Sequence, residues 1–272
     1  MMECKKALVE ADGDIDAAAE IMRKSGAAKA DKKAGRVAAD GAIKAAVSED
    51  GKSAVILEVN SETDFVAKDE NFQAFADAVL AVVAVQRPDT VEALSSLQLD
   101  NGQSVEEARQ ALIAKVGENI QLRRFEIMQS DASIACYLHG ARIGVLVDSS
   151  ASDDLARDIA MHIAAVNPQF VDRDAVPGDF VEKEKGILIA QAESSGKPPE
   201  IIEKMIQGRL NKLLAEVTLT GQPFVKDPEQ TVAQLLSAAG AEVHGFIRYE
   251  VGEGIEKKVE DFAAEVASQL KS

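Results

Sequence analysis

The side chains most often used in catalysis are few and widely separated in this sequence. The three histidines are His139, His162 and His244, and the cysteines are Cys4 and Cys136. None of them has the HExxH or CxxC spacing of a zinc site, and the glycine-rich motifs that hold nucleotide phosphates are absent. We therefore expect a protein that is not an enzyme, holds no metal and needs no cofactor. His162 has core spacing on a predicted helix, which favours packing over catalysis.

One polar segment contains an aromatic residue in an unexpected place. Residues 61–70 read SETDFVAKDE and follow the apolar, strand-like run AVILEVN. In one interpretation they begin a helix, with Thr63 or Asp64 as the cap and Phe65 packed back onto the core. In the other, Phe65 is presented beside Asp64 for insertion into a partner. A partner pocket would recover the roughly 1.5–3 kcal/mol that an exposed Phe forgoes.

Apolar alternation and turn residues predict the same order of elements twice. Each copy has two strands, a helix, an intervening segment and then a third strand of the same sheet. This order indicates two related antiparallel-sheet-plus-helix subdomains of α+β class. The elements expected are strands at 41–47, 54–60 and 118–128 with a helix at 71–84, then strands at 133–140, 142–148 and 242–252 with a helix at 153–166.

Helical segments surround the two copies. Residues 1–26 predict two helices, with Asp14 as an N-cap and Gly26 as a C-cap. A basic stretch follows, and it is either a solvated connector or a docking site for an acidic partner. The domains expected are 1–26, a linker at 27–40, a core subdomain at 41–130, a second core subdomain at 131–250 with an inserted hairpin at about 178–222, and a C-terminal helical module at 251–272.

The inserted hairpin and the tail both carry apolar stripes. Helices are expected at 181–195 and 200–217 around the SSGKPP turn, and the second has a stripe of coiled-coil type. This stripe either packs within a folded-back hairpin or mediates self-association or partner binding. The tail, 257–270, predicts an amphipathic helix that docks on its own core or in a partner's groove.

Composition narrows the classes of partner. The 272 residues carry a formal net charge of -16, and no apolar run reaches the roughly 20 residues of a membrane span. Phosphate backbones are bound through Lys and Arg, so we expect no direct nucleic acid partner and no membrane partner. Two cysteines far apart indicate a reducing, cytoplasmic compartment rather than a disulfide framework.

Segments along nearly the whole chain together resemble the elongation factor Ts family. They include MMECKKALVEADGD, KKAGRVAADG, TDFVAKD, GENIQLRR, HGARIGVLV, SGKP, LTGQPFVKDP and GFIRYEVGEGIEK. The resemblance implies a guanine nucleotide exchange factor for elongation factor Tu in translation elongation. It also implies an N-terminal ubiquitin-associated-like module of three helices. Here the sequence starts within that module's segment, so the module is expected to lack its first helix.

The resemblance also implies which residues contact elongation factor Tu. Thr63, Asp64, Phe65 and Val66 would approach its magnesium-side switch region and dislocate Mg²⁺. Val116, Gly117 and His139 would face the same GTPase domain, and Lys5 would contact it near the base side of the nucleotide. The sequence leaves open whether the protein forms a homodimer or a 2:2 complex with elongation factor Tu.

Two other classes compete with this interpretation. A non-catalytic adaptor with a ubiquitin-associated-like module predicts that Phe65→Ala leaves nucleotide exchange unchanged. A hydrolase or transferase requires an acid and base pair in a pocket, and the sequence offers no candidate pair.

Overall fold

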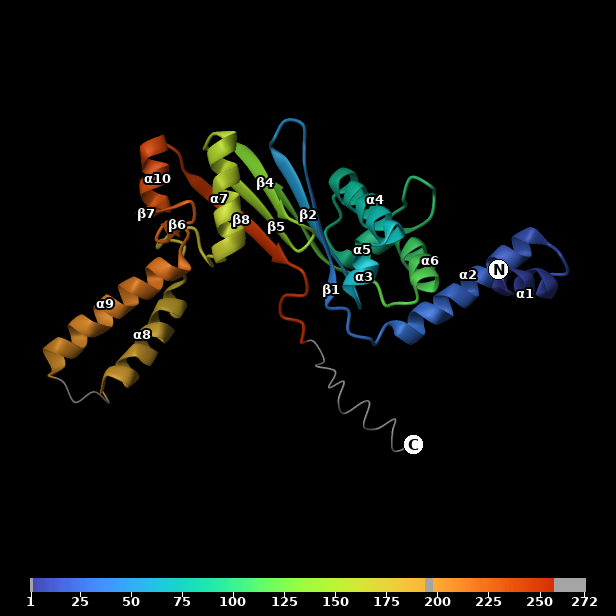
Figure 1. Cartoon of the computed structure of the whole chain (residues 1–272), viewed down its shortest axis with the longest axis horizontal. Coiled ribbons are helices and arrows are strands. Elements are labelled where there is room, and N and C mark those ends of the chain that lie inside the picture. Colours follow the sequence, from blue (N-terminus) through green and yellow to red (C-terminus); the bar gives the residue numbers. More distant parts are fainter. Residues whose placement is uncertain (1, 194–197, 257–272) are drawn as a thin grey trace. The chain divides into compact units, whose positions relative to one another are not determined.

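The structure, a computed structural model, describes residues 2–193 and 198–256 and mixes helices with small sheets. It confirms the α+β class at this coarse level. The chain forms two compact units. One is built from the described residues within Met1–Lys44, Val55–Ile127 and Tyr249–Ser272, and the other from those within Ala45–Ala54 and Met128–Arg248. Figure 1 shows both units and labels most of their elements.

The predicted repeat of element order is present in the structure. One sheet has the strand order β1-β2-β3 and another has the order β4-β5-β8. In each, the third strand pairs with the second strand of the preceding hairpin. The six strands are β1 (Asp40–Val47), β2 (Ser53–Ser61), β3 (Gln121–Gln129), β4 (Ser133–His139), β5 (Ile143–Ser149) and β8 (Val243–Glu250).

The first unit contains the helices of the N-terminal half. They are α1 (Met2–Glu10), α2 (Ile15–Lys33), α3 (Asp64–Ala67), α4 (Glu70–Gln86), α5 (Val91–Ser96) and α6 (Val105–Val116). Strand β2 is buried along nearly its whole length, as expected of the middle strand of a sheet. Lys44 on β1 pairs with Asp77 on α4 at 2.6 Å. Helix α2 packs against both α1 and α6.

The N-terminal helices differ from the prediction at one end. Asp14 caps α2 as expected, because its carboxylate accepts hydrogen bonds from the N–H groups of Asp16 and Ala17, both at 2.9 Å. The C-cap expected at Gly26 is wrong, since α2 continues to Lys33 and ends at Ala34. Ala28 and Ala30 are strong helix formers and favour this continuation. The boundary expected between residues 26 and 27 therefore falls inside a helix.

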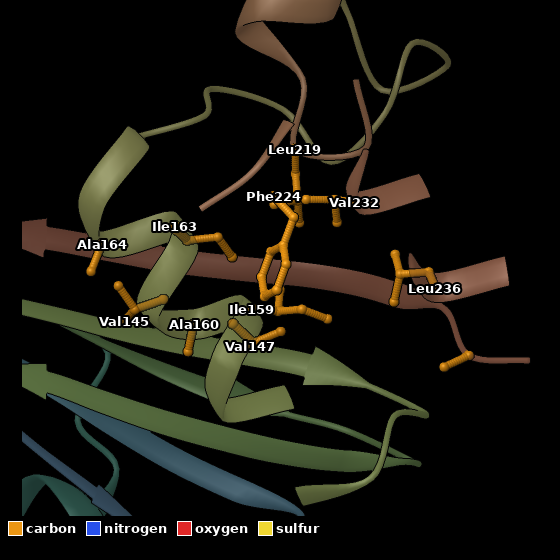
Figure 2. Packing of buried hydrophobic residues seen from close by; sticks show 11 residues of the cluster. Val145, Val147, Ile159, Ala160, Ile163, Ala164, Leu219, Phe224, Val232 and Leu236 are labelled. Atoms are coloured by element: carbon orange, nitrogen blue, oxygen red, sulfur yellow. The ribbon is translucent and has the colours of Figure 1, made fainter. Parts of the chain in front are cut away.

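The second unit has its core under α7 (Asp153–Val166), whose bounds match the prediction. This helix packs against β4 and β5, which pair antiparallel with Ala135 opposite Val147. Figure 2 shows the Phe224 ring directed toward Ile159 of α7, beside Leu219 and Val232. The short elements that complete this core are β6 (Pro223–Phe224), β7 (Asp227–Thr231) and α10 (Val232–Ala239).

His162 belongs to this core, as its spacing predicted. Its side chain is fully buried, and its Nδ1 accepts a hydrogen bond from the N–H of Val225 at 3.1 Å. The neutral ring therefore carries its proton on Nε2, which lies 2.9 Å from Oε1 of Gln222. Burial lowers the pKa of His162, although the hydrogen bond with Gln222 opposes this. The ring stays neutral and serves packing.

The inserted helices form a hairpin, α8 (Gly178–Glu193) and α9 (Pro199–Val217), which lie side by side in Figure 1. Within the stripe on α9, Ile206 and Leu210 are buried, whereas the other three members, Ile202, Leu213 and Val217, are half-buried. The folded-back interpretation accounts for the two buried members. The helix expected at 257–270 lies outside the described residues, as does most of the SSGKPP turn.

Candidate functional site

Phe65 is an outward-facing aromatic residue on a very short helix. Thr63 caps α3 as one sequence interpretation expected, because its Oγ1 accepts a hydrogen bond from the N–H of Val66 at 3.4 Å. The packing expected in that interpretation is wrong, since Phe65 is 80% exposed. Ala67, two residues further, is buried and accepts a hydrogen bond from Gln73 at 2.5 Å. The turn is thus held at both ends while the ring between them faces solvent.

Asp64 lies beside Phe65 and is also exposed. Its carboxylate pairs with Lys68 one helical turn later, at 2.6 Å. An exposed pair of this kind is worth only about 0–1 kcal/mol, so Lys68 holds the carboxylate loosely. A carboxylate and an aromatic ring are therefore both exposed on the α3 turn. The second sequence interpretation also placed both side chains at the surface.

The structure brings the predicted segment 116–117 next to the predicted segment 63–66. Gly117 caps the C-terminus of α6 with a left-handed φ of 84°, a conformation that costs a residue with a Cβ roughly 1–2 kcal/mol. The following residue, Glu118, reaches Thr63. Its Oε2 accepts from the Thr63 N–H at 3.0 Å, and its Oε1 accepts from the Thr63 hydroxyl at 2.7 Å.

A second tie joins the same two segments one residue away. The N–H of the buried Asn119 donates to Oε1 of Glu62 at 2.7 Å. Its side-chain amide donates to the carbonyl of Arg36 at 2.8 Å, and the guanidinium of Arg36 lies 3.4 Å from Glu62. The residues just after α2 therefore enter the same network. Lys33, at the end of α2, donates to the carbonyl of Gly117.

The remaining predicted contacts lie elsewhere. Lys5 is exposed on α1, which packs on α2 and so belongs to the first unit. Val116 is half-buried at the end of α6. His139 is exposed at the end of β4 in the second unit, where its Nδ1 lies 3.1 Å from the Tyr137 hydroxyl. The network therefore joins the segment Thr63–Val66 to the residues from Gly117 to Asn119.

Three residues of this network were not singled out from the sequence. Glu62, Glu118 and Asn119 read there as ordinary polar residues next to a strand and a helix end. The available signals were that Glu62 stood within the unusual segment 61–70, and that GEN, at 117–119, stood within one of the segments that carry the family resemblance. Sequence separations of 55 and 57 residues between the bonded partners explain why local patterns could not pair them.

The sheet behind this site contains a buried ionic cluster. Glu58 on β2 is fully buried and accepts from Arg123 at 2.9 Å, Arg124 at 2.7 Å and the N–H of Gly252 at 2.8 Å. Burial alone would raise the pKa of Glu58, but these donors together with Asn60 more than offset it, and its pKa lies below the ordinary value. The cluster fixes residues 250–253, from which the tail continues, against β2 and β3.

The described parts of the chain show neither a metal site nor a membrane-spanning helix. Within residues 2–193 and 198–256 there is no group of three His, Cys, Asp or Glu side chains that could hold a metal ion. Among the helices in these ranges, none combines the length and apolarity required to cross a membrane. The exposed ring and carboxylate on a fixed turn instead suit recognition of another macromolecule.

Comparison with known proteins identifies the family of the chain. The family model described as Elongation factor TS matches residues 62–253, which include the α3 turn, strand β3 and the whole β4-β5-β8 sheet. The chain is 60% identical over 274 residues to elongation factor Ts of Thioalkalivibrio sulfidiphilus. It is 59% identical over 273 residues to that of Alkalilimnicola ehrlichii, and 57% identical over 273 residues to that of Legionella pneumophila.

These similarities extend over entire chains. Each alignment covers 100% of this chain and 93–94% of the relative. Identity of this level and extent defines the class of protein as a translation elongation factor. More narrowly, the chain belongs to the elongation factor Ts family.

Proposed function

We propose that this protein is a guanine nucleotide exchange factor for elongation factor Tu in the cytoplasm, and that it is not an enzyme. It binds elongation factor Tu with GDP and promotes GDP release. The observation that carries this proposal is the 80% exposure of Phe65 on a turn anchored at both ends. A ring held in water forgoes burial worth about 1.5–3 kcal/mol, which a partner pocket restores.

In the proposed mechanism, the α3 turn approaches the magnesium-side switch region of the GTPase. Phe65 inserts between side chains there, and Asp64 disturbs the groups that hold the water shell of Mg²⁺. Mg²⁺ neutralises phosphate charge, so its dislocation weakens the hold on GDP. Val66 and Thr63 shape the turn, and Val116 and Gly117 contact the same domain from the adjacent segment. His139 and Lys5 add contacts from β4 and α1.

The coupling requires more than one contact. Changing the population ratio of distorted to undistorted GTPase from 1:99 to 99:1 requires that the exchange factor bind the distorted state more tightly by about 5.5 kcal/mol. One buried ring supplies only part of that amount. The N-terminal helices, both sheets and the C-terminal residues offer the additional surface that a broad interface requires.

The direct test is stopped-flow release of fluorescently labelled GDP from elongation factor Tu, with excess unlabelled GDP and increasing amounts of this chain. We expect the rate of release to rise steeply with the concentration of the chain and to reach a plateau. A rate that stays at the spontaneous value, with a chain shown to be folded by circular dichroism, would reject the exchange function. Binding to elongation factor Tu without faster release would favour an adaptor.

A further inference from the structure

The α3 turn does not have enough internal interactions to define its own conformation. It comprises only Asp64–Ala67, and helices this short do not persist in water because nucleation is unfavourable. The ring of Phe65 contributes little packing, since 80% of it is exposed. The position of the ring before any partner binds must therefore be set by groups outside the turn.

Glu118 is the main such group at the start of the turn. Both of its carboxylate oxygens bind Thr63, one at the backbone N–H and the other at the hydroxyl. The same hydroxyl oxygen accepts the N–H of Val66, so Glu118 orients the cap that begins α3. Hydrogen bonds to an ionised acceptor are about twice as strong as neutral ones.

Glu118 is itself fixed by its neighbours. Gly117 turns the chain after α6, and Asn119 is buried and bound to Glu62 and to the Arg36 carbonyl. Glu62 and Glu118 thus form a reciprocal pair of ties. Each segment offers one carboxylate to an N–H of the other. Neither segment can shift without breaking charge-assisted hydrogen bonds.

We propose that Glu118 is a positioning residue, which holds the cap of α3 so that Phe65 is presented in its binding orientation before elongation factor Tu arrives. The proposal rests on the exchange function proposed above. Its physical basis is preorganisation, because a factor that is competent only part of the time binds with an affinity reduced by that fraction. Glu118 acts through Thr63 and need not touch the partner.

The first measurement needs no partner. The chain contains no Trp, so Phe65→Trp places a single fluorophore at the tip of the turn. We expect Glu118→Gln in this background to speed the local decay of fluorescence anisotropy, because an amide offers one acceptor oxygen where the carboxylate offers two. Glu92→Gln, at an exposed glutamate of α5, is the matched control and should leave the decay unchanged. An unchanged decay in Glu118→Gln would overturn the proposal.

The second measurement uses labelled GDP release with the natural Phe65. We expect Glu118→Gln to raise the concentration for half-maximal release about tenfold, and to leave the plateau rate within about a factor of two. Glu92→Gln should behave as the unmodified chain, whereas Thr63→Val should reproduce the Glu118→Gln shift. The double variant Thr63→Val/Glu118→Gln should shift the half-maximal concentration little further than either single variant, because both substitutions disrupt the same contact between Glu118 and Thr63.

Additive shifts in that cycle would overturn the proposal, since they would mean that Glu118 contacts the partner independently of Thr63. An unchanged half-maximal concentration in Glu118→Gln would overturn it as well. Failure of the unmodified chain to release GDP would instead reject the exchange function, while the anisotropy measurement would still decide whether Glu118 fixes the turn. Should Glu118→Gln fail to fold, Thr63→Val compared with the Glu92→Gln control provides the same test.

Discussion

At the scale of single residues, the exposed Phe65 is the feature that most needs a functional explanation. Val85 on α4 is equally exposed, at 81% against 80% for Phe65, so exposure by itself is not unusual in this chain. The difference is in the surroundings. Phe65 follows a carboxylate on a turn tied at Thr63 and buried at Ala67, and this arrangement keeps the ring in place.

We predict that Phe65→Ala slows the GDP release promoted by this chain about 10- to 150-fold at low concentrations of the chain. This range is the burial free energy of one Phe side chain converted to a ratio of rates. Stability should change by less than about 0.5 kcal/mol, because the ring packs on little in the free protein. Stopped-flow release and urea unfolding measure the two effects.

Val85→Ala is the matched control for this prediction, since it also truncates an exposed apolar side chain in the first unit. It should leave both release and stability nearly unchanged. Equal release by Phe65→Ala and the unmodified chain would contradict a role for the ring and favour the adaptor interpretation.

At the scale of elements, the tie between β2, β3 and the residues after β8 depends on one buried carboxylate. Glu58 bonds Arg123, Arg124 and the N–H of Gly252, and the guanidinium of Arg124 lies 4.0 Å from the centroid of the Tyr249 ring. Breaking a buried pair leaves the remaining charges uncompensated, which costs more than the pair contributes.

We predict that Glu58→Gln lowers the free energy of unfolding by about 3 kcal/mol at pH 7. The pKa of Glu58 is lowered in the folded protein, so its contribution is fully present above the ordinary pKa of 4.5 and declines as the pH falls below that value. The difference between the variant and the unmodified chain should therefore shrink below about pH 4.5.

Urea unfolding at pH 7 and at acidic pH measures this difference. Glu49→Gln, at an exposed position in the turn between β1 and β2, controls for the loss of a surface charge. A Glu58→Gln variant as stable as the Glu49→Gln control at pH 7 would show that the cluster contributes nothing to stability.

At the scale of the whole molecule, net charge constrains the partner. The chain carries 46 acidic and 30 basic residues. Some basic side chains in and after α2 are engaged within the chain, such as Lys24 with Glu20 at 2.8 Å and Arg36 with Glu62 at 3.4 Å. Phosphate recognition requires basic groups that can replace counterions.

We accordingly predict no binding of transfer RNA or single-stranded RNA at about 0.15 M salt, with a dissociation constant above roughly 100 μM, the weak end of nonspecific binding. Fluorescence anisotropy of labelled RNA titrated with the chain measures this, and elongation factor Tu serves as the positive partner in the same buffer. Micromolar RNA binding with a steep salt dependence would contradict the prediction.

The sequence by itself determined the elements and their repeated order, because strands, caps and helical stripes are local patterns. Asp14 and Thr63 act as caps through groups two or three residues away, and the bounds of α7 followed from spacing alone. The same reasoning misjudged Gly26, where favourable alanines further along carried α2 past a residue that usually ends a helix.

Only the tertiary structure decided what surrounds the predicted site. Sequence patterns left two orientations open for Phe65, since the same cap is compatible with a ring packed inward or directed outward. The pairing of Glu118 with Thr63 and of Asn119 with Glu62 joins residues more than fifty positions apart, and local periodicity contains no information about such distances. Folding of α6 against its neighbours brings the Glu118 carboxylate to Thr63 at the start of the α3 turn, and that contact sets the direction of the ring.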